Sequence, residues 1–285
     1  MIVYSTMMKP FYNHSFILLF FCVTIFAGCA RQPITRTKNI IYSPANQLSL
    51  NVFAPKNKKQ PKEVLLFIHG GSWVHGKKST YNFFGRGMAH KGVVTVVMDY
   101  RLSPLAGYDG MAMDAATAVQ WIKTHIAEYG GDPDRIFISG HSAGGQMAAL
   151  VATDNSYFDS LHVKDALKGV ILIDAFGLDM YDYLCRNPYP LYLNIFTNDH
   201  ATWKLGSPVY HLNDHMPPFL MFLGGKTYPD IISGNNEFYT SAKKYQPGLQ
   251  LITVPHTRHV GMIFSFLNPG KKAYRQIIDF MKSCK

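Results

Sequence analysis

The segment that decides the fold is RIFISGHSAGG, which runs from Arg135 to Gly145. It combines an apolar, strand-like run with a Gly-x-Ser-x-Gly pattern and a following stretch of small residues that favours a helix. Gly140 and Gly144 stand where a sharp strand-to-helix turn leaves almost no room for a side chain. Such a turn lifts the Ser142 hydroxyl above a sheet, at a helix N-terminus that favours developing negative charge. The segment therefore predicts a nucleophile elbow with Ser142 as the nucleophile.

A second glycine-rich motif, HGGSW at residues 69–73, follows another buried apolar run, Val64–Ile68. Adjacent glycines let the backbone approach a substrate carbonyl and aim N–H groups at it. We therefore expect the backbone N–H groups of Gly71, Ser72 and Ala143 to form an oxyanion hole. The loss of one such donor typically removes about 3 kcal/mol of transition-state stabilisation.

Apolar runs alternate with helical patterns along the rest of the chain. Strands are expected near 40–42, 48–53, 64–68, 93–98, 135–139, 169–173, 219–223 and 250–254, and helices near 80–91, 109–129, 144–153, 236–244 and 272–282. This alternation predicts an α/β fold with a mostly parallel, doubly wound sheet flanked by helices. Such sheets place their chemistry beyond the carboxyl ends of the strands, where both glycine-rich motifs fall.

Four ordered motifs between residue 40 and the C-terminus resemble the α/β-hydrolase superfamily. They are HGGSW at 69–73, DYRLSP at 99–104, GDPDRI at 131–136 and the Ser142 elbow. The most similar branch contains hormone-sensitive-lipase-like carboxylesterases, acetyl and feruloyl esterases, and kynurenine formamidase. The resemblance implies an α/β-hydrolase fold and a Ser–acid–His triad, in that chain order, that works through a covalent acyl-enzyme.

The same resemblance places the catalytic base after the last expected strand, in the stretch VPHTRH at residues 254–259. His259 is the better match because a helix-like apolar run follows it directly, and His256 is the alternative. The base accepts the proton of Ser142 and later gives it to the leaving group.

The position of the triad acid departs from the family pattern. The usual acid lies three residues after the glycine that follows the penultimate strand, and that position holds Thr227. Asp230 lies on the same loop and is the expected acid. Asp174 and Asp179, after the preceding strand, are alternatives, and so is a Ser–His dyad with no carboxylate.

Residues 1–28 are predicted to be a bacterial lipoprotein signal peptide. Phe16–Phe26 is an apolar run of the length of a signal-peptide core. The string Phe-Ala-Gly-Cys that ends at Cys29 resembles a lipobox, although Phe26 stands where Leu is usual. A lipid on Cys29 and a tether over residues 29–39 would anchor the protein in the bacterial cell envelope, on a periplasmic or outer-membrane face. An ordinary cleaved signal and a short anchor helix are the alternatives.

The formal net charge of +10 is mostly scattered along the chain. Its one dense run is Lys56, Lys58, Lys59 and Lys62, which lies among prolines and is predicted to be a solvated loop. No nucleic-acid-binding signature accompanies it, so nucleic acid is not an expected partner.

The remaining cysteines and histidines predict no metal or cofactor. Cys185 and Cys284 permit one disulfide but do not establish it. His211 and His215 have the spacing of a metal pair, but no Glu follows His211 and nearby prolines disfavour a helix.

An aromatic stretch between two expected strands, within residues 178–213, is expected to form a small cap over the site. The alternative is a local mini-core. Trp73 and His75 either line the acyl pocket or pack beside the oxyanion loop.

These features together predict a serine esterase. Ser142 attacks a carboxylic ester, His259 carries the proton and Asp230 orients His259. The expected substrates are acetyl or feruloyl esters of glycans, or small alkyl esters, that reach an envelope-anchored enzyme from outside. An amide-directed hydrolase, such as a formamidase or peptidase, and a non-catalytic binding protein of hydrolase shape are the alternatives.

Overall fold

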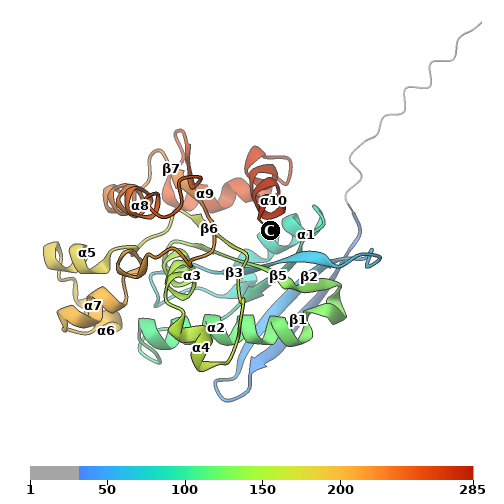
Figure 1. Ribbon diagram of the computed structural model, residues 1–285, viewed down its shortest axis with the longest axis horizontal. Coiled ribbons are helices and arrows are strands. Elements are labelled where there is room, and N and C mark those ends of the chain that lie inside the picture. The colour runs from blue at the N-terminus through green and yellow to red at the C-terminus, as the bar shows by residue number, and fades with distance from the viewer. Residues whose placement is uncertain (1–31, 285) are drawn as a thin grey trace, which may run out of the picture. The chain divides into compact units, whose positions relative to one another are not determined.

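The computed structural model describes residues 32–284, and Figure 1 shows this part of the chain as a sheet with helices on both faces. Its strands are β1 (Ile34–Ser43), β2 (Leu48–Pro55), β3 (Lys62–Ile68), β4 (Val94–Met98), β5 (Gly131–His141), β6 (Gly169–Ile173), β7 (Phe219–Gly224) and β8 (Gln250–Val254). They form one sheet in the order β1-β2-β4-β3-β5-β6-β7-β8. All neighbours from β4 to β8 pair in parallel, whereas β2 pairs antiparallel with both β1 and β4.

Helices connect the strands and cover the sheet. The α-helices are α1 (Asn82–Ala89), α2 (Tyr108–His125), α3 (Ala143–Thr153), α4 (Ser156–Ser160), α5 (Met180–Arg186), α6 (Pro190–Phe196), α7 (His200–Leu205), α8 (Pro229–Ala242), α9 (His259–Phe264) and α10 (Lys272–Ser283). Short 3-10 helices are η1 (Lys78–Tyr81), η2 (Ile126–Tyr129), η3 (Pro208–His211) and η4 (Ser265–Leu267). The predicted doubly wound α/β architecture is therefore confirmed.

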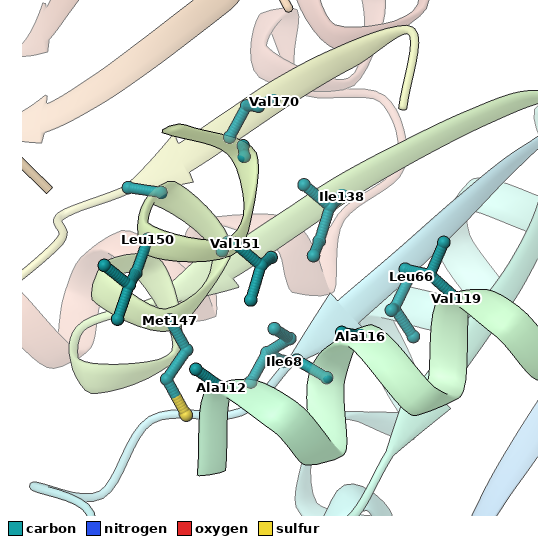
Figure 2. Close-up of a cluster of buried hydrophobic side chains, with 14 of the residues drawn as sticks. Leu66, Ile68, Ala112, Ala116, Val119, Ile138, Met147, Leu150, Val151 and Val170 are labelled. Atoms are coloured by element: carbon teal, nitrogen blue, oxygen red, sulfur yellow. The ribbon is translucent and has the colours of Figure 1, made fainter. Parts of the chain in front are cut away.

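Each face of the sheet has its own hydrophobic core, because successive side chains of a strand point to opposite faces. In β3, Leu66 and Ile68 join the core under α2 and α3, whereas Leu65 and Phe67 join the core under α1, α9 and α10. Figure 2 shows the first core, where the small side chains of α2 and the apolar face of α3 meet the strands. Burial on both faces explains why the parallel strands are continuous apolar runs in the sequence.

The predicted tether over residues 29–39 is too long, because β1 already begins at Ile34. Ile34 pairs with Pro55 of β2. Residues 35–39 are exposed on this edge strand and are polar, so they carry no hydrophobic pattern that marks a strand. Backbone pairing with β2 is what makes them a strand.

The predicted signal segment 1–28 and Cys29 lie outside the described residues. Within residues 32–284, no helix has the length and apolar character needed to cross a membrane.

Candidate active site

Ser142 lies at the tip of the turn between β5 and α3, in a strained backbone conformation with φ 56° and ψ −123°. A Cβ added to Gly140 would lie 2.1 Å from the carbonyl oxygen of Gly144. A Cβ added to Gly144 would lie 2.3 Å from the carbonyl oxygen of Ile68. Only glycine fits either position, so the turn has the steric requirements of the predicted elbow.

Three side chains form a row of hydrogen bonds that starts at Ser142. His259 Nε2 lies 3.0 Å from Ser142 Oγ, and His259 Nδ1 lies 2.7 Å from Asp174 Oδ2. Since an ionised carboxylate only accepts, Nδ1 carries the proton and Nε2 is free to accept the proton of Ser142. The Asp174 side chain is fully buried. The row has the order nucleophile, base and acid that acyl transfer requires.

The prediction that Asp230 orients His259 is wrong. Pro229 begins α8, which places Asp230 in the first helical turn. There its carboxylate lies 3.4 Å from the guanidinium of Arg186. Asp174, one of the alternatives from the sequence, is the carboxylate that contacts His259.

The position that holds the acid in related hydrolases contributes a hydroxyl here. Asp174 accepts hydrogen bonds from the N–H of Gly224 at 2.7 Å and from the hydroxyl of Thr227 at 2.5 Å. Gly224 is the last residue of β7 and Thr227 follows it, and β7 pairs with β6, the strand that Asp174 follows. These bonds to a charged acceptor fix the carboxylate for His259. Thr227 thus supports the acid instead of providing it.

The other candidates from the sequence lie away from Ser142. Asp179 caps α5 by accepting the N–H of Asp182 at 2.9 Å, and burial raises its pKa. His256 is exposed on the loop before His259, in a left-handed conformation with φ 58°. His259, and not His256, is therefore the histidine at the nucleophile.

The predicted oxyanion loop has free donors close to the nucleophile. Gly71 and Ser72 have φ values of 135° and 52°. Within residues 32–284, the N–H groups of Gly71, Ser72 and Ala143 donate to no other protein group. Ser72 and Ser142 line the same cleft. Unpaired amides on a loop beside the nucleophile meet one requirement for the stabilisation of an oxyanion.

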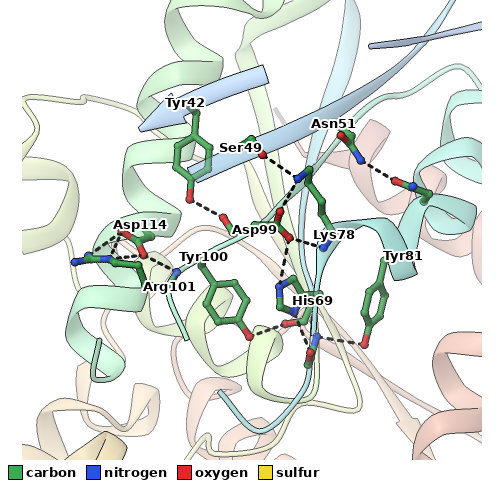
Figure 3. Close-up of polar contacts among 12 residues, drawn as sticks. Tyr42, Ser49, Asn51, His69, Lys78, Tyr81, Asp99, Tyr100, Arg101 and Asp114 are labelled. Atoms are coloured by element: carbon green, nitrogen blue, oxygen red, sulfur yellow. Dashed lines mark hydrogen bonds and ion pairs between the residues drawn. The ribbon is translucent and has the colours of Figure 1, made fainter. Parts of the chain in front are cut away.

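A polar network behind this loop holds it in place (Figure 3). The Tyr100 hydroxyl donates to the carbonyl oxygen of His69 at 3.1 Å, and the Tyr81 hydroxyl accepts the N–H of Gly70 at 3.3 Å. Asp99, just before Tyr100, pairs with Lys78. Through Asp99 and Tyr100, the DYRLSP motif thus helps to position the oxyanion loop.

His141, the variable residue directly before Ser142 in the elbow motif, supports the base. Its ring stacks on that of His259 with centroids 4.7 Å apart. Its Nε2 lies 3.3 Å from the carbonyl oxygen of His259, and its Nδ1 lies 3.4 Å from the Tyr81 hydroxyl. Burial lowers the pKa of His141 to about 3, so its ring is neutral at neutral pH. The sequence pattern does not reveal this role, because Gly-x-Ser-x-Gly leaves the residue before the serine unspecified.

A cleft of about 410 Å³ opens over Ser142 and His259. Its walls are aromatic: Phe176, Tyr183, Tyr192 and Tyr228. Tyr183 lies in α5 and Tyr192 in α6, so the segment between β6 and β7 forms part of the wall, as expected of a cap.

Trp73 packs beneath this wall. It is fully buried, its indole N–H donates to Gln146 at 3.1 Å, and its ring meets those of Tyr192 and Phe196 edge-on. His75 is exposed. The sequence left two hypotheses open for Trp73, a place in the acyl pocket and packing beside the oxyanion loop. The structure shows the packing.

The described part of the chain holds no cluster of three or more His, Cys, Asp or Glu side chains that could bind a metal ion. His211 Nε2 lies 2.9 Å from the carbonyl oxygen of Leu205. Cys185 is exposed and Cys284 is buried, and both are free thiols.

Known proteins share this sequence pattern and fold. A family model described as BD-FAE matches residues 50–229. The chain belongs to the BD-FAE family. This membership and the similarity to named esterases confirm the α/β-hydrolase fold and the carboxylesterase branch that the motifs predicted.

Two curated relatives of this BD-FAE member carry esterase names. A probable isoprenylcysteine alpha-carbonyl methylesterase of Arabidopsis thaliana is 28% identical over 208 residues, which are 67% of this chain and 44% of the relative. The probable carboxylic ester hydrolase LipM of Mycobacterium tuberculosis is 31% identical over 181 residues, 56% of this chain and 40% of the relative. The chain thus spans less than half the length of these relatives.

Among solved structures, an inhibited esterase B from Lactobacillus rhamnosis superposes with a TM-score of 0.75 at 19% identity. The match covers 89% of this chain and 88% of the esterase B chain. At that identity, the similarity establishes the fold.

Proposed function

We propose that this BD-FAE member is a serine hydrolase that cleaves carboxylic esters through an acyl-enzyme. The observation that carries the proposal is the row Ser142–His259–Asp174, which lies beside the free amides of the oxyanion loop. The esterase names of the relatives support the same reaction class.

Acylation begins when Ser142 Oγ attacks the ester carbonyl carbon while His259 Nε2 takes the hydroxyl proton. The carbonyl oxygen becomes an oxyanion, which the N–H groups of Gly71, Ser72 and Ala143 stabilise. Asp174 stabilises the imidazolium that forms on His259. The imidazolium then donates its proton to the departing alkoxide, which leaves as the alcohol, with the acyl group on Ser142.

Deacylation repeats these steps with water as the nucleophile. His259 takes a proton from the water, which attacks the acyl-enzyme carbonyl, and then returns a proton to Ser142 Oγ. The products are the carboxylic acid and the free enzyme.

The aromatic walls of the cleft favour an aromatic or short acyl group. Asp230, which lines the cleft and pairs with Arg186, offers a polar contact for a hydroxylated alcohol such as a sugar. Acetyl or feruloyl esters of glycans and small alkyl esters remain the substrate classes that we propose.

Hydrolysis of p-nitrophenyl esters from acetate to octanoate by residues 30–285 tests the reaction class. We expect Ser142→Ala to reduce kcat about 10⁴- to 10⁶-fold, because it removes the nucleophile. A fluorophosphonate should label the wild type and spare the variant. Equal turnover by both proteins, or faster cleavage of matched p-nitroanilides, would contradict the esterase proposal.

We also propose that Cys29 is lipidated and anchors the protein in the cell envelope. The apolar run before it and its small neighbours support this modification. Metabolic labelling of the full chain with an alkyne fatty acid in a bacterial host should mark the wild type but not Cys29→Ala. Labelling of both proteins, or of neither, would contradict the anchor.

A further inference from the structure

The end of the sheet opposite the catalytic cleft carries a basic pocket of about 320 Å³. Its charged lining residues are Lys62, Lys91, Arg135, Lys282 and Glu63. They come from the turn before β4, from the amino-terminal parts of the adjacent strands β3 and β5, and from α10. The catalytic loops follow the carboxyl ends of these strands. The seven residues of β3 span roughly 20 Å, so the basic pocket and the cleft face opposite ways.

Three lysines of the pocket have no partner carboxylate. Glu63 is the one acidic residue that lines the pocket, and its carboxylate lies 3.2 Å from the guanidinium of Arg135. This carboxylate therefore already has a partner. Within residues 32–284, Lys62, Lys91 and Lys282 have no carboxylate within 4.0 Å, the limit for an ion pair. Lysines that gather around a hollow without internal counter-charge attract an external anion.

The chain enters the fold at this same end. The carbonyl oxygen of Gln32 lies 2.8 Å from His90 Nδ1, and His90 directly precedes Lys91. The carbonyl oxygen of Pro33 accepts the N–H of Lys56, in the lysine-rich turn, at 2.8 Å. Cys29 precedes Gln32 by three residues, so covalent geometry limits the separation of their Cα atoms to about 11 Å.

We propose that the surface formed by Lys62, Lys91 and Lys282 docks on an anionic phospholipid bilayer, so that the catalytic cleft faces away from the membrane. In the cell, this docking rests on the proposed function, because the proposed lipid on Cys29 would bring the protein to the membrane. The docking itself depends on the lysines. A lysine held near an anionic bilayer raises partitioning roughly fivefold, and lipid plus basic surface provides the two signals of stable attachment.

This orientation narrows the substrate class. Esters embedded in the supporting bilayer would lie on the far side of the fold from Ser142. The enzyme would therefore act on esters that arrive through the aqueous phase, such as soluble glycan fragments, and not on membrane lipids.

Vesicle co-sedimentation tests the docking without the lipid anchor. The protein used is residues 30–285, which contain all the strands and helices from β1 to α10. The vesicles hold either 30% phosphatidylglycerol in phosphatidylcholine or phosphatidylcholine alone. We expect binding to the anionic vesicles that Lys62→Glu, Lys91→Glu and Lys282→Glu together weaken about 100-fold.

A second triple variant supplies the matched control. Lys77→Glu, Lys226→Glu and Lys271→Glu change the net charge by the same amount at exposed positions that follow the carboxyl ends of β3, β7 and β8, away from the pocket. We expect these changes to weaken binding less than threefold. Equal losses in the two triple variants would show general charge attraction and overturn the proposal. So would equally tight binding to soluble polyphosphate at the same phosphate concentration.

Energy transfer to an acceptor lipid tests the orientation. Cys185 is an exposed native thiol in α5, on the cleft side, whereas Lys59 lies in the lysine-rich turn. A donor on Cys185 should transfer little energy, and a donor on Lys59→Cys in a Cys185→Ser background should transfer much more. The reverse order would overturn the proposal. Turnover of p-nitrophenyl acetate is measured separately, so a failed esterase and a failed docking surface give different results.

Discussion

The carboxyl end of β5 and the carboxyl ends of β6 and β7 encode their catalytic residues in different ways. At β5 the requirements for Ser142 lie within five consecutive residues, because the sharp turn excludes side chains from Gly140 and Gly144. At β6 and β7 the acid and its hydrogen-bond donors come from two separate loops. A nucleophile elbow is therefore a local property of sequence, whereas the triad acid is defined by which loops meet in space.

The acid can come from either loop because the two strands are neighbours. Ile173 is in register with Phe222, and the N–H of Asp174 donates to the carbonyl oxygen of Phe222 at 2.8 Å. A carboxylate after β6 therefore reaches the same point beside His259 as one after β7. The hydroxyl of Thr227 then stabilises the acid instead of competing with it.

The largest effect is expected at His259, where the two regions meet. His259→Ala removes the base and should lower kcat for a p-nitrophenyl ester about 10⁴- to 10⁶-fold. The matched His256→Ala variant should stay within twofold, because His256 is exposed and contacts neither Ser142 nor Asp174. A larger loss in the His256 variant would show that the base is misassigned.

Gly144→Ala should break the elbow through sterics alone. Its Cβ would lie 2.3 Å from the backbone oxygen of Ile68, so we expect a loss of about 3 kcal/mol in the free energy of unfolding. Gly234→Ala in α8 is the control, because its Cβ meets nothing within 4 Å, and it should stabilise the protein by about 0.5–1 kcal/mol. Urea denaturation measures both. Equal stability of the two variants would contradict the steric account.

His141 should make stability depend on pH. Burial lowers its pKa to about 3 in the folded protein, below the value of roughly 6.5 in the unfolded chain. Between these values the unfolded state binds more protons, so this contribution to stability is full above pH 6.5 and is lost as pH falls towards 3. From pH 7.5 to 5 we expect a loss of about 2 kcal/mol from this group. His141→Asn should reduce the loss measured by urea denaturation by that amount, and an unchanged loss would assign it to other groups.

Thr227→Val tests the acid side with the smallest change. It keeps the side-chain shape and removes the hydroxyl that donates to Asp174, so we expect kcat to fall about tenfold, as for one hydrogen bond to a charged group. Thr227→Ser should retain most of the activity. If the Val and Ser variants have the same kcat, the hydroxyl does not position the acid.

The sequence predicts the features that depend on local patterns, and it fails where a feature depends on which segments meet in space. The parallel strands, the elbow and the oxyanion loop are predicted, because burial on both faces and close backbone approach leave local patterns. The first half of β1 is missed, because its polar residues pair only through the backbone at a sheet edge. Asp174 is ranked below Asp230, because a carboxylate after a strand shows nothing of its distance from a histidine 85 residues away.

The most direct test of the Ser142–His259–Asp174 site compares Asp174→Asn with Asp230→Asn. We expect Asp174→Asn to lower kcat/KM about 10⁴-fold, because the amide cannot stabilise the imidazolium or hold the correct tautomer. With p-nitrophenyl acetate, whose alcohol has no sugar hydroxyl for Asp230 to contact, Asp230→Asn should stay within about threefold, since it disturbs an exposed ion pair with Arg186. Adding Thr227→Asp to Asp174→Asn should recover part of the loss, because it places a carboxylate after β7, from where it can reach His259. A large loss in Asp230→Asn together with an active Asp174→Asn would contradict the account.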